Sequence, residues 1–359
     1  MHLTSLVERE WPLLAVSSLS RQCSSSVRAT EQRLAGRRAA GGARLKPDVS
    51  AHHMNLGECD RIFAQVHGAS SPSAICHALQ PLFDQYEVIN LELNRGTVFW
   101  RARSTEDKPW AAIAEMEYPP AEYAKPGRLN DEKTPCLYAA TREETALHEI
   151  GAKENDLVQL VGFRAKLETP IRIAVFGELL HVHKTGYLRL TGSDPGRSMS
   201  RYLNSQGVER GRRLLYIDAF LSHLLADAEA KNSEYVRSRA LASMVYRNSD
   251  IEGIMFPSVR DPLGMNIALQ PTPADLKIHA VCCLHVRVTR VRAFGFIEYE
   301  VISEAEQTTT DGMFVWARPH LPPRRRFFNL TKEEHEAAMR SANDPSAFMD
   351  VMSVYNNER

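Results

Sequence analysis

The sequence predicts an α+β fold, in which helices pack against a mixed or antiparallel sheet. Segments with the two-residue period of strands and segments with the period of helices follow one another without a regular β-α-β order. The phosphate-binding loops GxGxxG and GxxxxGK[ST] do not occur in the sequence. With 43% hydrophobic residues, the chain can bury a sizeable core.

The first part of the chain differs in composition from the rest. Residues 17–46 are rich in Ser, Arg, Ala and Gly and contain one acid, Glu31. Such a segment buries little apolar surface. We therefore interpret residues 1–54 as a disordered or non-native extension, which a translation start at Met54 would remove. The alternative is a mitochondrial transit peptide, because these are also rich in Arg and poor in acids.

The next residues predict a short helical segment and then the first strands. Residues 55–95 carry a weak helical pattern and form a small helical preface. "GTVFWRAR" (96–103) reads as a strand, and "CLYAA" (136–140) as a second one. Between them, the stretch "WAAIAEMEYPPAEYAKPG" (110–127) contains three prolines and reads as an irregular loop.

A helix is predicted directly after the second strand. Thr141 and Glu144 have the T-x-x-E spacing of a capping box, which satisfies free amides at a helix start. Three apolar residues of this helix share one face: Ala146, Leu147 and Ile150. Glu149 flanks that face, so we expect its carboxylate to reach past the helix.

The second half of the chain supplies most of the predicted sheet. Residues 161–167 and 171–175 alternate apolar and polar side chains, as half-buried antiparallel strands do. Helical patterns follow at about 214–225, where the apolar residues are mostly leucines, and at 236–245, where they are mixed. Further strands are predicted within 250–270 as a pair around a turn, at 278–288, and at 294–302 as the last strand.

Charge and cysteine content narrow the classes of partner. Lys+Arg and Asp+Glu both number 44, and this balance argues against a nucleic-acid partner. No apolar run approaches the roughly 18 residues of a membrane span. The 6 cysteines form no CxxC pair, so we expect no structural metal and no disulfide framework. The default location is therefore a reducing cytoplasm.

Three residues suit a dinucleotide substrate that carries a pyrophosphate. Arg128 follows Gly127, which allows close approach of the backbone, and its guanidinium could bind phosphate through two bonds. Arg101, near the end of "VFWRAR", could supply a second cation, and Tyr138 could stack on a planar base. The structural alternatives are a surface charge for Arg101, a turn residue for Arg128 and also for Asn130, and a core aromatic for Tyr138.

Two further residues suit chemistry at a sugar. Glu149 could bind a ribose hydroxyl and stabilise positive charge at the anomeric carbon, as carboxylates do in glycosidases. Ser258, after Pro257 at a strand end, could orient the substrate. Alternatively, Glu149 pairs with Lys153 four residues later on the helix surface, and Ser258 caps the strand end.

Five pieces of the sequence together resemble the RES domain family. They are "VFWRAR", the Pro-Pro loop, "GRLN", "LYAATREETALHE" and "IMFPSVRDPLGMNIAL", within residues 96–290. The Arg, Glu and Ser that name the family would be Arg101, Glu149 and Ser258, its catalytic residues. The same resemblance places Arg128, Asn130 and Tyr138 in the site as residues that bind NAD. Residues 291–359 would be a C-terminal extension with a terminal helix that starts at Thr331.

The resemblance implies a split sheet like that of ADP-ribosyltransferases, with NAD in a cleft. It implies cleavage of the nicotinamide–ribose bond of NAD, with phosphate as a co-substrate or with water, and without a metal or a further cofactor. Family members include toxins that deplete NAD and are neutralised by an Xre-type antitoxin. Two alternatives stay open: a protein ADP-ribosyltransferase, for which the extra segment at about 180–230 could dock the acceptor, and a non-catalytic module that binds NAD or a partner. The oligomeric state is left open.

Overall fold

The computed structural model describes residues 54–93, 98–166, 170–189, 198–262 and 264–317. They all belong to one compact unit, 54–359. The predicted extension up to residue 53 and the predicted helix after Thr331 lie outside the described residues. Within the described ranges, no helix is long and apolar enough to cross a membrane.

The described strands form one mixed sheet. Their order is β1-β5-β6-β7-β3-β2-β4-β8-β9-β10. Only the pair β5–β6 is parallel, and every other neighbouring pair is antiparallel. The strands are β1 Ile89–Leu93, β2 Val98–Thr105, β3 Leu137–Ala140, β4 Leu157–Ala165, β5 Ile171–Val175, β6 Gly253–Pro257, β7 Met265–Leu269, β8 Ile278–Val291, β9 Ile297–Thr308 and β10 Phe314–Ala317. This mixed sheet with packed helices confirms the predicted α+β class.

The sheet has a seam between β2 and β3. These two strands pair only at Trp100 and Ala140, whereas β2 pairs with β4 along its whole length. The seam divides the strand order into two halves, β1-β5-β6-β7-β3 and β2-β4-β8-β9-β10. Helix α4 (Glu143–Ile150) packs over the seam, where Ala146 and Leu147 join Trp100 and Ala140 in one apolar cluster.

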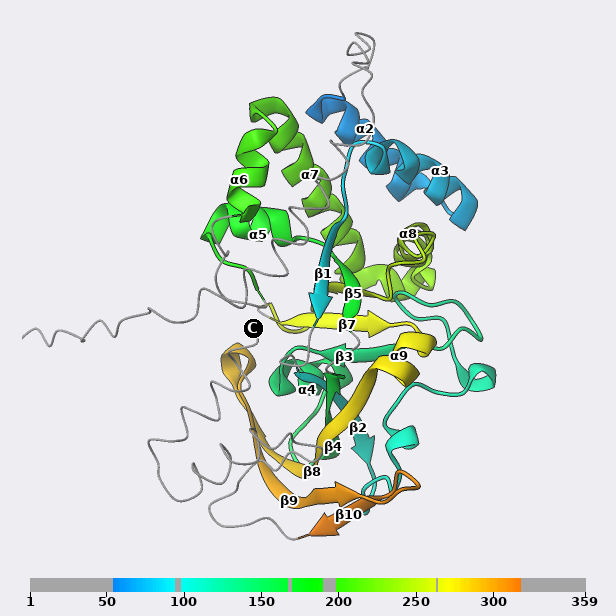
Figure 1. The fold of residues 1–359 in the computed structure, drawn as a ribbon, viewed down its shortest axis with the longest axis vertical. Helices are drawn as coiled ribbons and strands as arrows, with labels where there is room; N and C mark the ends of the chain where they lie inside the picture. The colour runs from blue at the N-terminus through cyan, green and yellow to red at the C-terminus, as the bar shows by residue number, and fades with distance from the viewer. Residues whose placement is uncertain (1–53, 94–97, 167–169, 190–197, 263, 318–359) are drawn as a thin grey trace, which may run out of the picture. The chain divides into compact units, whose positions relative to one another are not determined.

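Most helices pack on the first half of the sheet. Figure 1 shows them gathered beside β1 and β5, while β8, β9 and β10 lie at the other end of the view. Their apolar faces bury Ala174, Ile254 and Ala268 of the sheet. These helices are α2 Leu56–Gly68, α3 Pro72–Phe83, α5 Glu178–Thr185, α6 Ser198–Ser205, α7 Val208–Leu225 and α8 Val236–Val245. The short helix α9 Pro271–Lys277 connects β7 to β8.

A buried carboxylate joins α7 to the start of α5. Asp218 is fully buried and accepts hydrogen bonds from the Tyr86 hydroxyl at 2.6 Å and from the amides of Gly177 and Leu180 at 2.9 and 3.0 Å. Burial raises the pKa of Asp218, while these hydrogen bonds favour the ionised form. Two helices of the extra segment at about 180–230, α5 and α7, are thereby joined to each other and to Tyr86.

The structure corrects three predictions of secondary structure. Residues 89–93, assigned to the helical preface, form β1, because Ile89, Leu91 and Leu93 alternate with polar residues and pair with β5. The strand predicted at 294–302 is not the last one, because β10 follows it in the chain. The capping box is wrong: α4 begins at Glu143, and Thr141 instead bonds to the Met265 carbonyl through both its amide and its hydroxyl.

Candidate active site

Glu149 lies in the last turn of α4, beside the seam. The helix ends there because Gly151 adopts the left-handed conformation, with φ of 67°, that terminates many helices. Glu149 is half-buried, and its Oε1 accepts hydrogen bonds from Ser258 Oγ at 2.5 Å and from Asn266 Nδ2 at 2.7 Å. The structure therefore brings two predicted site residues, Glu149 and Ser258, into direct contact.

Ser258 is held by the loop between β6 and β7. Its hydroxyl oxygen accepts the amides of Arg260 and Asp261 at 3.1 and 3.0 Å. Its own amide donates to the Gly264 carbonyl at 2.9 Å. Because the oxygen already accepts two bonds, its proton is directed to Glu149. Ser258 does cap the strand end, as the structural alternative proposed, and in doing so it faces the carboxylate.

The same loop is fastened to α4 by Asp261. Its Oδ2 accepts from the Thr145 hydroxyl at 2.5 Å and from Arg142 Nη2 at 2.7 Å. Gly264 lies so close that a Cβ on it would be 2.5 Å from Thr145 Oγ1 and 2.6 Å from Asp261 Oδ2. Real Cβ atoms are not found at such distances, so this position needs glycine.

We expect Gly264→Ala to displace the loop and with it Ser258. The free energy of unfolding should fall by about 1–3 kcal/mol, as for overpacked sites, and ligand binding at Glu149 should weaken. Chemical denaturation measures the change. Gly68→Ala is the control, because a Cβ there has no neighbour within 4 Å, and it should leave stability unchanged or slightly raised. Equal stabilities for the two variants would contradict the close packing at Gly264.

Asn130 and Tyr138 build the turn that carries Arg128. The Asn130 side-chain amide donates to the carbonyls of Lys125, Asp131 and Thr134 at 2.9–3.0 Å. The Tyr138 hydroxyl donates to Asn130 Oδ1 at 2.9 Å and accepts the Leu129 amide at 2.7 Å. These contacts fit the structural alternatives for the two residues. Their contact with a substrate stays a prediction.

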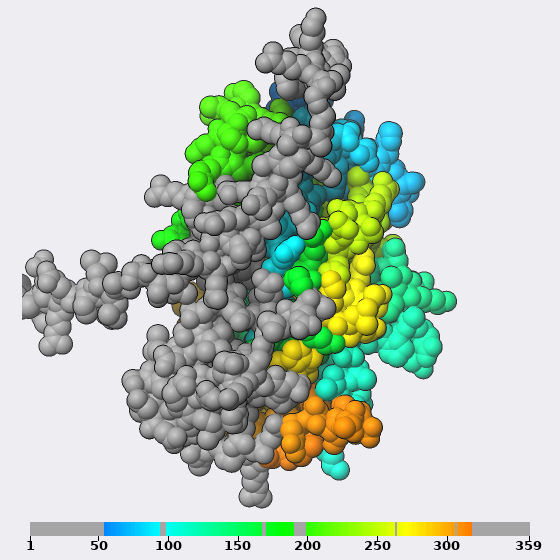
Figure 2. Space-filling model, viewed as in Figure 1, coloured from blue at the N-terminus to red at the C-terminus, as the bar shows by residue number. Residues whose placement is uncertain are grey.

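The other side of this turn borders a cavity. It has a volume of about 330 Å³ and lies between the turn, α8 and the start of α9. Figure 2 shows the turn segment in teal at the surface next to the yellow residues around α9. Neither Glu149 nor Ser258 lines this cavity, so it is separate from the Glu149 cluster.

Arg128 extends from the turn to the segment that precedes α8. It is half-buried, and its Nη1 donates to the Asp227 carbonyl at 2.9 Å. Burial lowers the pKa of Arg128, and the nearby Tyr235 and Glu149 act in the opposite direction. That Arg128 and Glu149 bind the same ligand stays a prediction.

Arg101 occupies the seam of the sheet. Its Nη1 donates to the Tyr138 carbonyl at 2.9 Å, while its buried Nε has no hydrogen-bond partner among the described residues. Burial, followed by the neighbouring Arg103, lowers the pKa of Arg101 to about 10, so the side chain is still a cation at neutral pH. Tyr138 thus connects Arg101 to the turn, although no contact joins Arg101 to Glu149 directly.

Several residues of this site were not predicted from the sequence. Asn266 and Asp261 hold Glu149 and Ser258, and Asp227 and Tyr235 contact Arg128. For Asn266 a signal was available, because an amide in the otherwise apolar run "MNIAL" of a buried strand needs a partner. For Tyr235 the sequence offered no comparable signal.

The sequence profile of the RES domain matches residues 98–290, more than half of the chain. This chain belongs to the RES domain family. The match confirms the resemblance seen in the sequence, and it runs from the start of β2 into β8. The RES domain therefore contains all six predicted site residues, as well as the helices of the 180–230 segment. No curated protein matches the chain.

Proposed function

We propose that this RES domain protein cleaves the nicotinamide–ribose bond of NAD. One observation carries the proposal: Glu149 is fixed through a single carboxylate oxygen. Oε1 accepts both Ser258 and Asn266, and Oε2 has no hydrogen-bond partner among the described residues. A half-buried carboxylate with one oxygen anchored and the other available is suited to face developing positive charge.

The chemistry matches this arrangement. When the C1′–N1 bond breaks, its electron pair goes to the pyridinium ring, and nicotinamide leaves as a neutral molecule. The ribose takes on oxocarbenium character, which a nearby carboxylate stabilises. When water is the acceptor, its oxygen bonds to C1′ and one proton is released to solvent; when phosphate is the acceptor, one of its anionic oxygens bonds to C1′ without loss of a proton. Glu149 would stabilise this charge, and Ser258 would keep the carboxylate in its orientation.

Two cations are available for the diphosphate of NAD. Within the described part of the chain, neither Arg101 nor Arg128 forms an ion pair with a carboxylate, although both are half-buried. Buried charges are normally paired, so an anionic ligand would complete the site. Under this proposal the two guanidinium groups hold phosphate oxygens, Tyr138 stacks on the nicotinamide ring, and Asn130 shapes the turn.

The test is a time course of the full chain with NAD labelled in its adenylate part, with and without phosphate. Chromatography separates NAD, nicotinamide, ADP-ribose and phosphorylated ADP-ribose. Release of nicotinamide that needs phosphate identifies a phosphorylase, and release without phosphate identifies hydrolysis. Label that stays on a protein acceptor identifies an ADP-ribosyltransferase. Binding of NAD without release under all conditions would refute the enzymatic proposal and favour a binding module.

A further inference from the structure

We infer that Tyr235, directly before α8, is a positioning residue for Arg128. In this role it sets the direction of the Arg128 guanidinium and, through it, the affinity of the site for the diphosphate part of NAD. The inference rests on the proposed function, because it concerns the same site. Tyr235 would be a further residue of this site, and it lies between the 3-10 helix Ala228–Ser233 and α8, where none of the six predicted site residues lies.

The geometry around Arg128 supports this role. The guanidinium carbon lies 5.4 Å from the centre of the Tyr235 ring, within the roughly 6 Å at which a cation is attracted to an aromatic face. Nη1 donates to the Asp227 carbonyl. Asp227 and Tyr235 lie at the two ends of the short 3-10 helix Ala228–Ser233, so one segment holds the guanidinium from two directions. Among the described residues, the remaining guanidinium N–H groups form no hydrogen bond, so they can bind a ligand.

The backbone of Tyr235 is held in an unfavourable conformation. Glu234 and Tyr235 have φ values of 49° and 59°, in the left-handed region that a bulky residue rarely adopts. Such strain persists only where the surroundings impose it. The Tyr235 amide donates to the Ala230 carbonyl at 2.7 Å, and the Tyr235 carbonyl accepts from the Arg239 amide at 2.9 Å. These two hydrogen bonds fix the backbone from which the Tyr235 ring projects.

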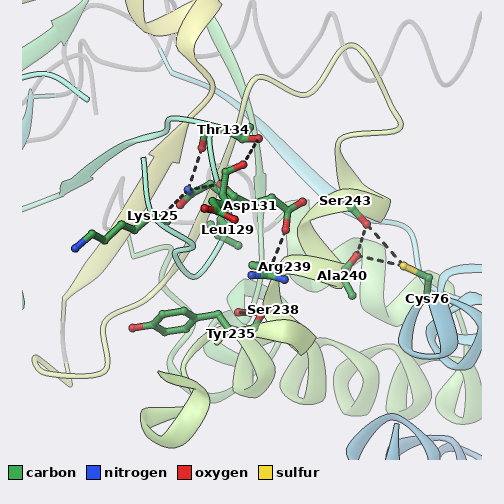
Figure 3. Close-up of polar contacts among 12 residues, drawn as sticks. Cys76, Lys125, Leu129, Asp131, Thr134, Tyr235, Ser238, Arg239, Ala240 and Ser243 are labelled. Atoms are coloured by element: carbon green, nitrogen blue, oxygen red, sulfur yellow. Dashed lines mark hydrogen bonds and ion pairs between the residues drawn. The ribbon is translucent and has the colours of Figure 1, made fainter. Parts of the chain in front are cut away.

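An ion pair attaches α8 to the turn that carries Arg128. Arg239 Nε lies 3.0 Å from Asp131 Oδ1, and Arg239 follows Tyr235 by one helical turn. Figure 3 shows the Arg239 side chain reaching from α8 to Asp131, while the ring of Tyr235, at the start of α8, extends to the left below the segment with Leu129 and Asp131. The turn thus contacts α8 at two points, Arg128 with Tyr235 and Asp131 with Arg239, which keeps Tyr235 opposite Arg128.

The test compares Tyr235→Phe, Tyr235→Ala and Tyr235→Leu in the full chain. The phenylalanine keeps the aromatic face, whereas alanine and leucine remove it. We expect the Ala and Leu variants to raise KM for NAD and Kd for ADP-ribose by about 3- to 30-fold, the range of a partly desolvated cation–π contact. The value of kcat and the affinity for nicotinamide alone should stay within about two-fold of the wild-type values, and Tyr235→Phe should behave like wild type. Tyr187→Ala, on an exposed tyrosine elsewhere, is the control.

The possible results separate this inference from the proposed function. Unchanged ADP-ribose affinity in the Ala and Leu variants, with a wild-type protein that binds ADP-ribose, overturns the role of Tyr235 alone. So does an equal loss of nicotinamide and ADP-ribose binding, which would indicate general damage to the site. If Tyr235→Phe bound ADP-ribose as weakly as the Ala and Leu variants, the role of the aromatic face would be overturned. A wild-type chain that binds neither NAD nor ADP-ribose would overturn the inference together with the proposed function.

Discussion

Replacement of Glu149 by glutamine is expected to lower kcat for NAD cleavage by at least 10²–10³-fold, the order found when one group that stabilises transition-state charge is removed. The affinity for NAD should change only a few-fold. The reason is that the amide oxygen of glutamine can still accept the bonds from Ser258 and Asn266, so the loop and helix keep their places. What the variant lacks is the negative charge opposite the anomeric carbon.

The control for this variant lies on the same helix. Glu144 is exposed, and Glu144→Gln removes the same charge from α4 without affecting the contacts of Glu149. It should keep kcat within about two-fold of the wild-type value. Nicotinamide release is followed by chromatography, and binding by calorimetry. If Glu149→Gln retained more than about a tenth of the wild-type kcat, the proposed role of the carboxylate would be wrong.

The largest loss of stability is expected for Asp218→Ala. The change leaves the Tyr86 hydroxyl and the amides of Gly177 and Leu180 without their acceptor in a fully buried place. Each buried donor without a partner costs about 1–3 kcal/mol, and water that enters the vacated space offsets part of the total. We expect the free energy of unfolding to fall by about 3 kcal/mol or more. Urea denaturation measures it.

Asp218→Asn removes the charge but keeps part of the hydrogen bonding. The asparagine keeps one oxygen, which can still accept from Tyr86 and Gly177, but its amide group cannot accept from Leu180. The stability of this variant should therefore lie between those of the wild type and of Asp218→Ala. An alanine variant that loses less than about 1 kcal/mol would show that the three bonds do not hold α5 and α7 together.

The parts of the fold that the sequence predicted are those with local signals. The alternation along β4 and β8 and the leucine pattern of α7 are visible in short windows of sequence. The capping box at Thr141 was also a local signal, but pairing with Met265, 124 residues away, prevailed over it. The short edge strands β1 and β10 present too few residues for the alternation to be decisive.

In the site, too, the residues with a local sequence signal were predicted, and those placed by contacts between distant parts of the chain were not. Glu149, Ser258 and the arginines were predicted because their surroundings in the sequence resemble the RES family. Their partners were not, since Asn266 approaches Glu149 across 117 residues and Tyr235 reaches Arg128 from the turn directly before α8. Contacts of this kind depend on the strand order and on helix packing, and neither can be read from the spacing of residues along the chain.

At the seam between β2 and β3, Arg101 also has a structural role in the sheet. Strands that pair at one position leave most of their facing carbonyls without a main-chain donor, and Arg101 supplies a side-chain N–H to one of them, that of Tyr138. The Arg101 side chain therefore replaces one of the main-chain hydrogen bonds that would otherwise join β2 to β3. Removing it would loosen the join between the two halves of the sheet as well as remove a charge that we propose to bind phosphate. Inactivity of an Arg101 variant would identify a chemical role only if the two halves were shown to remain joined.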